Sequence, residues 1–575
     1  MTEEASATSS SLPKSIHQVL AQAETDFEKR VLKPISGFIV GIVAAMSGVL
    51  FGFDASIAAA CGGAVNAHFS ITEEPFLMGL WVACVPLGAL FGAILGGKVS
   101  NLLGRRKGLL LNAFLFILGI SVASLAPGFW VFVAARLLMG FAVGNSAVIT
   151  PMYMAEVSPP ESRGRILFMY QLSIVVGILV SFIVGVVVDT FIPSNDLNWR
   201  VMIACGLAPA LLFLFGMLKM PDSPRWLIET GMLHKGYEIL TRMMGRNDAR
   251  KTFGEIHEAT QNTETGTLRA VFGRLILPVV VLGFFLQFFQ QSTGINSDMY
   301  YGPEIFIEGG FSNAASMWAQ VAMGVVNLIA TVVSILLVDR LGRRKLMIIG
   351  VSGIVVMLCV QAYLFHVYEV QRAQAAGPAP SSEVHSQTSS VQTVQQTGAP
   401  NANQEVSSSA TDAASASNQS NAVPQGTVPG LTTYLIFTSI LLYIIFFAIS
   451  AGPLAWLIIS EIFPIRFRGI GMSIAVAANW LVDYFVSQLF PVMKQDLGMT
   501  TTTLIYACFT VVGLALAIKF LPETKGVPLE EIERNIYAGK RLREIGVPSG
   551  KVYGTKKTSS IRTENFGSAR VSHGK

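Results

Sequence analysis

Twelve apolar runs, each long enough to cross a lipid bilayer, constrain this chain of 575 residues more than any other feature. A helix needs about 20 apolar residues to span the hydrocarbon of a bilayer. Only 13% of the residues are charged, against about 25% in a soluble domain. We therefore predict an all-α membrane protein with two six-helix halves on either side of a polar stretch at 221–272. The runs lie near 36–60, 76–98, 107–126, 129–151, 167–192 and 200–220, and near 273–300, 316–338, 345–369, 431–456, 470–493 and 500–521.

Basic residues are distributed unevenly between the connecting segments. One set of loops carries Lys98, Arg105, Arg106, Lys107, Arg163, Arg165, Arg340, Arg343, Arg344, Lys345, Arg466 and Arg468. The alternate loops carry few, mainly Arg200, Arg372 and Lys494. Because basic loops stay inside, we expect these loops, the 221–272 segment and both termini to face the cytoplasm of a multi-pass plasma-membrane protein. The net charge of +5 reflects this rule, and we expect no nucleic-acid partner.

Features of secreted, metal-binding or catalytic proteins are not found in the sequence. A polar lead of about 35 residues precedes the first run, which argues against a signal peptide. The five cysteines are scattered in or beside the runs and suggest neither a disulfide framework nor a metal site. We find no arrangement of nucleophile and base and no phosphate-binding loop. We therefore expect no enzyme, no cofactor and no metal.

The two halves repeat each other at three matching points. The repeated pairs are Asn101–Lys107 with Asp339–Lys345, Ala155–Pro159 with Ser460–Pro464, and Pro221–Arg225 with Pro522–Gly526. Repeats in the same orientation indicate two parallel halves with a substrate site between them near mid-membrane, reached by rocking of one half against the other. We place the N-terminal half at 36–220, a cytoplasmic helical linker at 221–272 and the C-terminal half at 273–521.

The repeated Gly-Arg-Arg-Lys segments can be simple positive-inside anchors or parts of a gate. A tight glycine turn, paired basic residues and a nearby acid recur in both halves, which favours a cytoplasmic gate whose ion pairs hold one state closed. Asn101 stands where the second copy has Asp339, which predicts a weaker latch in the first copy. The candidate gate residues are Arg105, Arg106, Glu156, Arg163, Asp339, Arg343, Arg344, Glu461 and Arg468.

Three stretches lack the large apolar residues that a packed core needs. Residues 1–35 and the 522–575 tail are predicted to be cytoplasmic, with 1–30 and 541–575 disordered. Residues 371–430, rich in Ser, Gln, Ala and Thr, are predicted to be a disordered extracellular loop. This loop contains one glycosylation sequon at Asn418, of a kind that is common by chance.

A carboxylate and a guanidinium lie inside apolar runs, Asp54 in the first and Arg136 in the fourth. Ionisable residues within a membrane are candidates for function, and these two are each other's expected partner. Burial and a nearby cation shift a carboxylate pKa in opposite directions, so protonation of such a pair can depend on conformation. The alternative is a structural ion pair with no movement of a proton.

Amides interrupt several runs, most clearly in the segment Gln290-Gln-Ser-Thr-Gly-Ile-Asn296. An amide without a partner in hydrocarbon costs several kcal/mol, so these groups should face a cavity. Any single amide can instead bond to a neighbouring helix. Taken together, they favour a shared site for a neutral, hydroxyl-rich ligand. Gly294 and Pro303 predict a locally opened helix that lets the amides converge.

These motifs, in this order, resemble the sugar porter family of the major facilitator superfamily over about residues 36–540. The matching residues are Gly104-Arg-Arg, Pro221-Asp-Ser-Pro-Arg-Trp226, Gln290–Asn296, Gly452-Pro453 with Trp456, Glu461-Ile-Phe-Pro464 and Pro522-Glu-Thr-Lys-Gly526. The resemblance implies a hexose site at Gln171, Gln290, Gln291, Asn296, Asn327, Trp456 and Asn479. It also implies outer-gate tyrosines at Tyr300 and Tyr301, and further latch members Arg225, Glu229 and Glu523 among short cytoplasmic helices, unless those segments are solvated linkers.

The resemblance also bears on coupling and on the substrate. Proton-coupled members of the family carry Asp at position 54, whereas facilitative glucose carriers carry Asn. Asn479 is similar to the glucose carriers, which favours D-glucose. We expect a monomer in the lipid bilayer that moves a neutral sugar by alternating access with a proton, through Asp54 and Arg136. A facilitative hexose carrier, a proton-coupled myo-inositol or polyol transporter, and a sugar sensor remain alternatives. Asp298 and Asp483 depart from the family pattern.

Overall fold

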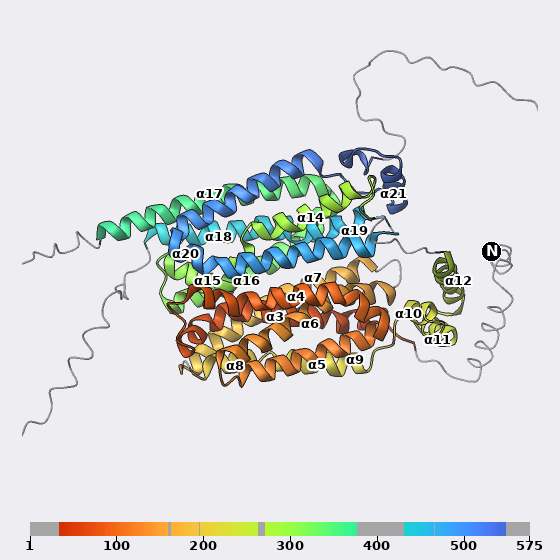
Figure 1. Cartoon of the computed structure of the whole chain (residues 1–575), viewed down its shortest axis with the longest axis horizontal. Helices are drawn as coiled ribbons and strands as arrows, with labels where there is room; N and C mark the ends of the chain where they lie inside the picture. The colour runs from red at the N-terminus through yellow and green to blue at the C-terminus, as the bar shows by residue number, and fades with distance from the viewer. Residues whose placement is uncertain are drawn as a thin grey trace, which may run out of the picture.

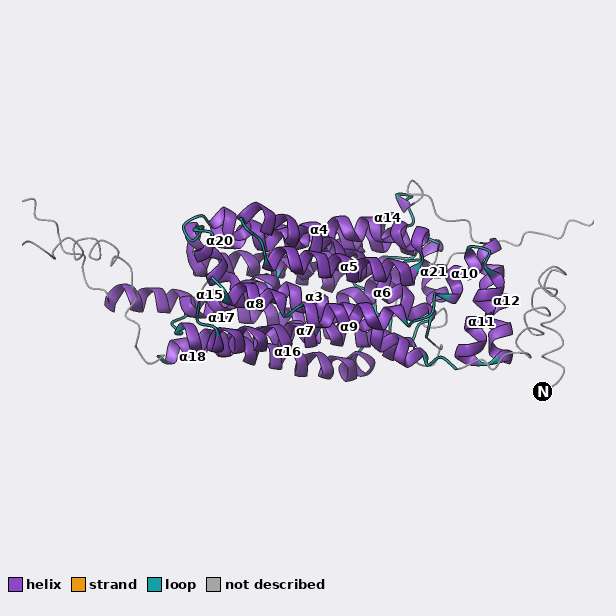
Figure 2. Ribbon diagram, turned by 90° about the horizontal axis from the view of Figure 1, so that it is seen from below, coloured by secondary structure: helices purple, strands orange, loops and turns teal. Residues whose placement is uncertain are grey.

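The computed structural model describes residues 34–158, 163–194, 196–262, 271–375, 430–464 and 466–547. All the elements assigned in these ranges are helical, and they pack as two bundles side by side (Figure 1, Figure 2). The N-terminal bundle contains α3 (Gly37–His68), α4 (Pro75–Leu103), α5 (Arg105–Ser124), α6 (Phe129–Glu156), α7 (Arg163–Phe191), α8 (Asn198–Ala204) and α9 (Leu207–Leu218). The C-terminal bundle contains α14 (Leu277–Ser292), α15 (Ile295–Glu308), α16 (Asn313–Leu341), α17 (Arg343–Ala375), α18 (Leu431–Ile449), α19 (Ala451–Ile462) and α20 (Arg468–Phe520).

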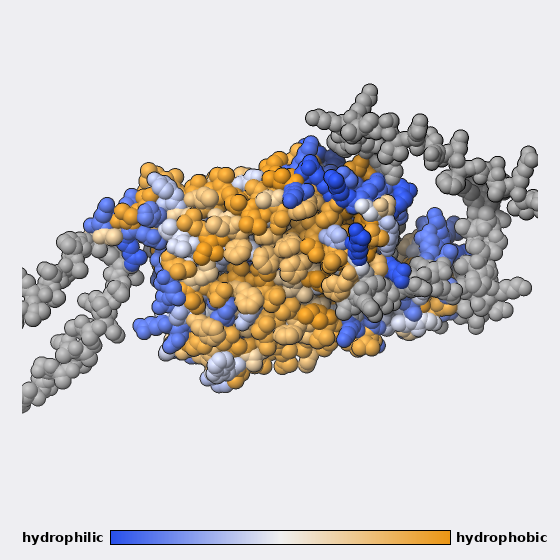
Figure 3. All heavy atoms as spheres, turned by 45° about the horizontal axis from the view of Figure 1, so that its top comes forward, coloured by the Kyte–Doolittle hydropathy of each residue, from blue (hydrophilic) through white to orange (hydrophobic). Residues whose placement is uncertain are grey.

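Short helices cover the end of the bundles that carries the repeated basic segments, which we call the basic end. They are α10 (Pro224–Glu229), α11 (Leu233–Met244), α12 (Arg246–Asn262), α21 (Leu529–Tyr537) and the 3-10 helix η2 (Leu542–Glu544). Hydrophobic side chains cover the broad middle of the molecule and hydrophilic ones collect at its ends (Figure 3). This distribution is that of a multi-pass membrane protein.

Within the described residues, ten helices are long and apolar enough to cross a membrane. One of them, α20, has 53 residues, about 80 Å at 1.5 Å per residue and far more than one bilayer crossing requires. Gly498, with φ 76°, breaks it into two parts. The helices α14 and α15, of 16 and 14 residues, together cover the predicted seventh span. The all-α, two-bundle fold is confirmed, and the count of twelve spans stays a prediction.

Some predicted boundaries differ from the helices. The helix α17 continues to Ala375, so the predicted loop at 371–430 starts inside a helix, and its residues 376–429 lie outside the described residues together with the sequon at Asn418. The segment at 221–272, predicted as a helical linker, contains three helices, and α11 buries an apolar face around Tyr237 and Leu240 against Phe253 of α12.

Small residues allow close packing inside each bundle. A Cβ on Gly144 of α6 would lie 1.9 Å from the Ala89 carbonyl oxygen of α4, so only glycine fits. Such close approach supplies the van der Waals contact that holds helices together in lipid. Between the bundles, α4 packs on α20, α3 on α15, and α7 on α16. The Gln488 Nε2 donates to the Phe76 carbonyl at 2.9 Å, near the end opposite the basic end.

Candidate functional site

Amide side chains from α14 and α20 form a cluster near the middle of the C-terminal bundle. The Asn479 Nδ2 donates to Gln287 Oε1 at 2.7 Å and to Gln290 Oε1 at 2.6 Å. The Gln291 Nε2 donates to Asn479 Oδ1 at 3.0 Å. The Gln290 Nε2 donates to the carbonyls of Ala451 and Gly452 at 3.1 and 2.8 Å. Gln287, Gln290, Gln291 and Asn479, here called the amide cluster, are all buried.

A break after α14 brings Asn296 to the same cluster. The helix ends at Ser292, Gly294 adopts φ 81° and ψ 10°, and α15 begins at Ile295. Glycine takes this left-handed conformation without the penalty that a Cβ brings. The Asn296 Nδ2 then donates to Gln291 Oε1 at 3.0 Å. The predicted helix opening at Gly294 is therefore present, and it joins two amides that an unbroken helix would separate.

The other three predicted sugar contacts lie on separate helices. Gln171 is half-buried on α7, Asn327 is buried on α16, and Trp456 is half-buried on α19, one turn after Gly452. None of the hydrogen bonds in the described part of the chain joins these three side chains to the amide cluster. The cluster proper thus comes from the C-terminal bundle, with Gln171 as the predicted contribution of the other bundle.

Asp54 and Arg136 form a buried ion pair in the N-terminal bundle. They come from α3 and α6 and are 2% and 1% exposed. The Arg136 Nη1 donates to Asp54 Oδ1, and the guanidinium carbon lies 5.8 Å from the centre of the Trp81 ring. The second oxygen, Asp54 Oδ2, is buried and accepts no hydrogen bond from the described residues. The predicted pairing of these two residues is therefore present, and one carboxylate oxygen of Asp54 has no hydrogen-bond donor among the described residues.

The two outer tyrosines are anchored on α20. The Tyr300 hydroxyl donates to Asp483 Oδ2 at 3.2 Å, and the Tyr301 hydroxyl donates to the Ser487 carbonyl at 2.9 Å. Both tyrosines are buried, and Tyr301 is the point where α15 bends, about two turns before its C-terminal end. Asp298, on the same helix, is half-buried.

At the basic end of the N-terminal bundle, Glu156 is the centre of a polar cluster. The Arg105 Nη2 donates to Glu156 Oε1 at 2.8 Å, and the Ser223 hydroxyl donates to Glu156 Oε2. Glu229 lies 3.7 Å from Arg105 and bonds to Arg225 within α10 at 2.9 Å. Arg106 turns to the last carbonyls of α9, donating to Leu218 at 2.6 Å.

The C-terminal bundle repeats this cluster around Glu461. The Arg343 Nη2 donates to Glu461 Oε1 at 2.9 Å, and the Thr524 hydroxyl donates to Glu461 Oε2 at 2.5 Å. Glu523 accepts the backbone N–H groups of Arg343 and Arg344, at 2.9 and 3.1 Å, and so caps α17.

The remaining candidate gate residues lie around this second cluster. The Arg344 Nη2 donates to the Ile518 carbonyl at 2.7 Å, and Asp339 lies 3.6 Å from Arg343. Arg468 Nε donates to the Phe463 carbonyl at 3.4 Å, and the side chain of Arg163 lies outside the described part of the chain. In this structure each of these ion pairs joins elements of the same bundle or of the segment directly following it, not one bundle to the other.

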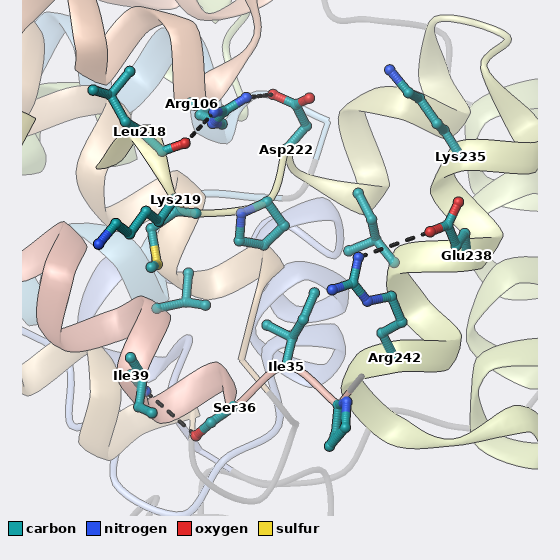
Figure 4. Close-up of a pocket in the computed structure, with 15 residues that line it drawn as sticks. Ile35, Ser36, Ile39, Arg106, Leu218, Lys219, Asp222, Lys235, Glu238 and Arg242 are labelled. Atoms are coloured by element: carbon teal, nitrogen blue, oxygen red, sulfur yellow. Dashed lines mark hydrogen bonds and ion pairs between the residues drawn. The ribbon is translucent and has the colours of Figure 1, made fainter. Parts of the chain in front are cut away.

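A cavity of about 480 Å³ lies at the basic end, between the start of α3, the end of α9 and α11. Arg106 and Asp222 face each other across one side of it, and Arg242 pairs with Glu238 on another (Figure 4). Its walls come from the N-terminal bundle and the segment after it, and none of the amide cluster residues lines it. This cavity is therefore separate from the candidate substrate site.

Sequence reasoning missed several residues of the site. Gln287 sits in a run that otherwise reads as apolar, but it precedes Gln291 by four residues and therefore shares its helix face. Ser487 likewise lies one turn after Asp483, which the sequence had already singled out, on α20. Ser223 and Thr524 were not singled out, although both lie in the repeated segments at matching points. Spacing of four residues from an assigned side chain is the signal that could have identified Gln287.

Comparison with known proteins places the chain among sugar transporters. The family model described as "Sugar (and other) transporter" matches residues 40–379 and 419–536. The chain is 31% identical over 508 residues to the major myo-inositol transporter IolT of Bacillus subtilis, covering 86% of this chain and 93% of that protein. It is 32% identical over 512 residues to the galactose-proton symporter of Escherichia coli K12, covering 88% and 96%.

Among solved structures, the chain is similar to the xylose transporter XylE of Escherichia coli in a partially occluded inward-open conformation. The TM-score is 0.66 at 28% identity, and the match covers 85% of this chain and 100% of that chain. These relatives are transporters, in agreement with the expectation that the chain is not an enzyme.

Proposed function

This chain belongs to the sugar transporter family of the major facilitator superfamily, and on that premise we propose that it carries a hexose, D-glucose, together with a proton. The amide cluster carries the proposal. It offers neutral donors and acceptors in a buried position, which suits ligand hydroxyls and supplies no charge to balance that of an ion. The similarity to a galactose-proton symporter and to XylE supports a sugar as the ligand.

The substrate residues in this proposal are Gln171, Gln290, Gln291, Asn296, Asn327, Trp456 and Asn479. The amides bond to each other in the structure, and a sugar would exchange amide–amide bonds for amide–hydroxyl bonds at little net cost. Trp456 offers an apolar ring face to sugar C–H groups and one N–H donor.

The proton is proposed to bind at Asp54. Removing two charges from water is costly, and the unpartnered Asp54 Oδ2 leaves a place on the carboxylate for a proton. Protonation would release Arg136 from its counter-ion, so the ion pair can exist in one conformation and open in another. The similarity to a galactose-proton symporter supports the same mechanism for this chain.

Alternating access requires that the bundles separate at one end and close at the other. In the proposal the basic end faces the cytoplasm of the plasma membrane, the termini lie on that side, and the protein acts as a monomer. The contact of Gln488 with Phe76 and the tyrosines Tyr300 and Tyr301 would then form the outer gate. The clusters around Glu156 and Glu461 would brace helix ends that move as units at the inner gate.

Uptake of labelled D-glucose by cells that lack their own sugar transporters tests the proposal. Unlabelled hexoses, xylose and myo-inositol are each added as competitors, and uptake of labelled D-glucose is measured at two pH values. We expect saturable uptake that D-glucose inhibits best and that is faster at the lower external pH. Absence of uptake of any sugar or polyol by a well-expressed protein at the cell surface would contradict the function as a transporter.

A proton-coupled transporter of myo-inositol is the second candidate, because the IolT relative shares 31% of its residues with this chain over nearly its whole length. The amide cluster would bind a polyol by the same hydrogen bonds as a hexose. The competition panel separates the two, since inhibition by myo-inositol but not by D-glucose would favour the polyol. Uptake that is indifferent to pH would instead indicate a facilitative carrier.

A further inference from the structure

Neighbouring turns of α15 and α20 connect the amide cluster to the outer tyrosines. The Asn296 Nδ2 donates to Gln291 Oε1 at 3.0 Å, and Tyr300 follows Asn296 by one helical turn on α15. The Tyr300 hydroxyl donates to Asp483 Oδ2 at 3.2 Å, and the Ser487 hydroxyl donates to Oδ1 at 3.1 Å. Asp483 is thus the point where the cluster, α15 and α20 meet.

Asp483 lies in an unusual place for an acid. It follows Asn479 by one helical turn on α20 and is 0% exposed. Its partners are neutral donors, and no basic side chain in the described part of the chain forms an ion pair with it. A buried charge is costly even with donors around it, so a neutral residue at this position would be expected if packing were its sole task.

The helix α15 is attached to one face of α20 along its length. Besides Tyr300 on Asp483, Tyr301 stacks on Phe490 with ring centres 4.9 Å apart, and Glu304 bonds to Lys494 at 3.1 Å. Positions 483, 487, 490 and 494 recur at intervals of three and four residues and so share a helix face. Of these attachments, the one at Asp483 is nearest to the cluster, because Asp483 lies one turn from Asn479 on α20 and Tyr300 one turn from Asn296 on α15.

We propose that Asp483 is a positioning residue that couples occupation of the amide cluster to the outer gate helix α15. The inference rests on the proposed function and deepens it. A ligand hydroxyl that replaces the bond between Gln291 and Asn296 moves Asn296, and Tyr300, one turn further along α15, moves with it against Asp483. The hydrogen bond between Tyr300 and the Asp483 carboxylate then becomes stronger or weaker, and α15 shifts at the outer end.

An ionised carboxylate suits this task because it accepts from several donors at once. Asparagine has nearly the same shape but presents one oxygen and an NH₂ group, and the NH₂ group would face the hydroxyl donor of Tyr300 or of Ser487. Asp483→Asn therefore removes the coupling without leaving a cavity. Asp298→Asn is the matched control, since it is the same substitution on α15 and no hydrogen bond links that side chain to Asp483.

The test measures hydrogen exchange of the α15 amides in the purified full-length protein, with and without D-glucose, together with D-glucose affinity and transport kinetics. In the wild type, D-glucose should change exchange in Ile295–Glu308. In Asp483→Asn, α15 should exchange about tenfold faster, as expected for the loss of one hydrogen bond to a charged group, and D-glucose should no longer change it. We expect kcat to fall about tenfold while the D-glucose Kd stays within about threefold. Asp298→Asn should behave as the wild type.

Two results would overturn the inference. One is an α15 response to D-glucose that persists in Asp483→Asn; the other is the same loss in Asp298→Asn. If Asp483→Asn does not fold, Tyr300→Phe breaks the same bond from the other side, and a normal response there overturns the inference equally. If the wild type binds no D-glucose, the proposed function fails for this sugar, while the exchange of α15 in Asp483→Asn still decides whether Asp483 holds the helix.

Discussion

The two bundles are alike at the basic end and differ in the middle of the membrane. At the basic end, Arg105 on Glu156 is matched by Arg343 on Glu461, at 2.8 and 2.9 Å. Ser223 and Thr524 occupy the second oxygen of each acid. The repeat therefore extends from the sequence motif to individual hydrogen bonds. Bracing of helix ends is a requirement that both bundles share.

In the middle, the N-terminal bundle contains a charged pair and the C-terminal bundle contains neutral amides. Asp54 and Arg136 are suited to exchange a proton, whereas Gln291 and Asn479 are suited to hold hydroxyls. The two bundles thus have similar basic ends and different polar groups in the middle. The comparison suggests that the proton and the sugar are handled in opposite bundles and that coupling depends on their relative movement.

Asp54→Asn should have the largest effect of the variants considered, because it removes the proposed proton site in the N-terminal bundle. One proton charge moving through a potential of 100 mV supplies about 2.3 kcal/mol, enough for about fiftyfold accumulation of a sugar. The variant should lose this accumulation and reach only equal concentrations, because the amide cannot exchange a proton. Uptake against a gradient in proteoliposomes at two pH values measures this.

Exchange of sugar across the membrane should survive in Asp54→Asn, since the amide cluster is intact. Asp298→Asn serves as a control of the same chemistry in the other bundle and should keep accumulation. Concentrative, pH-dependent uptake by Asp54→Asn would show that the ion pair is structural.

Gln291→Ala should have the next largest effect, on the sugar side. It removes an acceptor from Asn296 and a donor to Asn479, so buried polar groups lose partners at a cost of about 1–3 kcal/mol. We expect sugar affinity to fall about 10- to 100-fold. The sugar that is still transported should accumulate in a proton-dependent way, as in the wild type. Binding of D-glucose to the purified variant measures the change.

Gln361→Ala is the matched control for that substitution. Gln361 is a buried glutamine of the same bundle that donates to the Ser439 carbonyl at 3.3 Å, away from the cluster. An equal loss of D-glucose affinity in Gln361→Ala would mean that loss of any buried amide lowers affinity by destabilising the fold. That result would contradict a direct role of the amide cluster in sugar binding.

These centres could be predicted in part from the sequence. Amides inside apolar runs need partners, so the convergence of Gln290, Gln291 and Asn479 was foreseeable, as was the helix opening at Gly294. The pairing of Asp54 with Arg136 followed from their isolation in lipid. The family and fold were likewise readable from several motifs in one order, and both are confirmed.

Contacts that depend on how helices are placed against each other were not foreseeable. The register of α15 on α20 puts Tyr300 on Asp483, and no motif fixes that register. Gln287 escaped notice because a single amide in a phenylalanine-rich run carries little signal. The gate segments were predicted to join helix ends, but their ion pairs remain within one bundle here, since the sequence does not specify which conformation is adopted.

Glu156→Gln and Glu461→Gln test whether the two ends are equivalent. Each removes the charge that partners a buried or half-buried arginine, at a cost of about 1.5–3 kcal/mol. Since the clusters have the same geometry, we expect both to slow transport about tenfold, with sugar affinity unchanged. Transport rates and D-glucose binding measure this. A large effect from one bundle alone would show that the structural repeat hides different roles.

Asp339→Asn should have the smallest effect, and it sharpens the comparison at the one position where the repeats differ. The first copy has Asn101 there, which contributes its backbone carbonyl to the Trp226 indole N–H at 3.0 Å. In the second copy Asp339 is 82% exposed and lies 3.6 Å from Arg343, whose better partner is Glu461. This exposed pair joins the end of α16 to the start of α17. It should lie at the low end of the range of about 0.2–1 kcal/mol for exposed pairs, because Arg343 keeps Glu461, so the rate of uptake should change less than about twofold.

The predicted difference in latch strength between the copies therefore does not follow from this acid in the conformation described here. Asn101→Asp is the reciprocal variant, and it should also be nearly silent because Arg105 already has Glu156 and Glu229 as partners. If Asp339→Asn instead slows uptake tenfold while Asn101→Asp speeds it, the acid must find a better cation in another conformation. Such a result would place a contact between the two bundles at the basic end and assign the latch to the second copy.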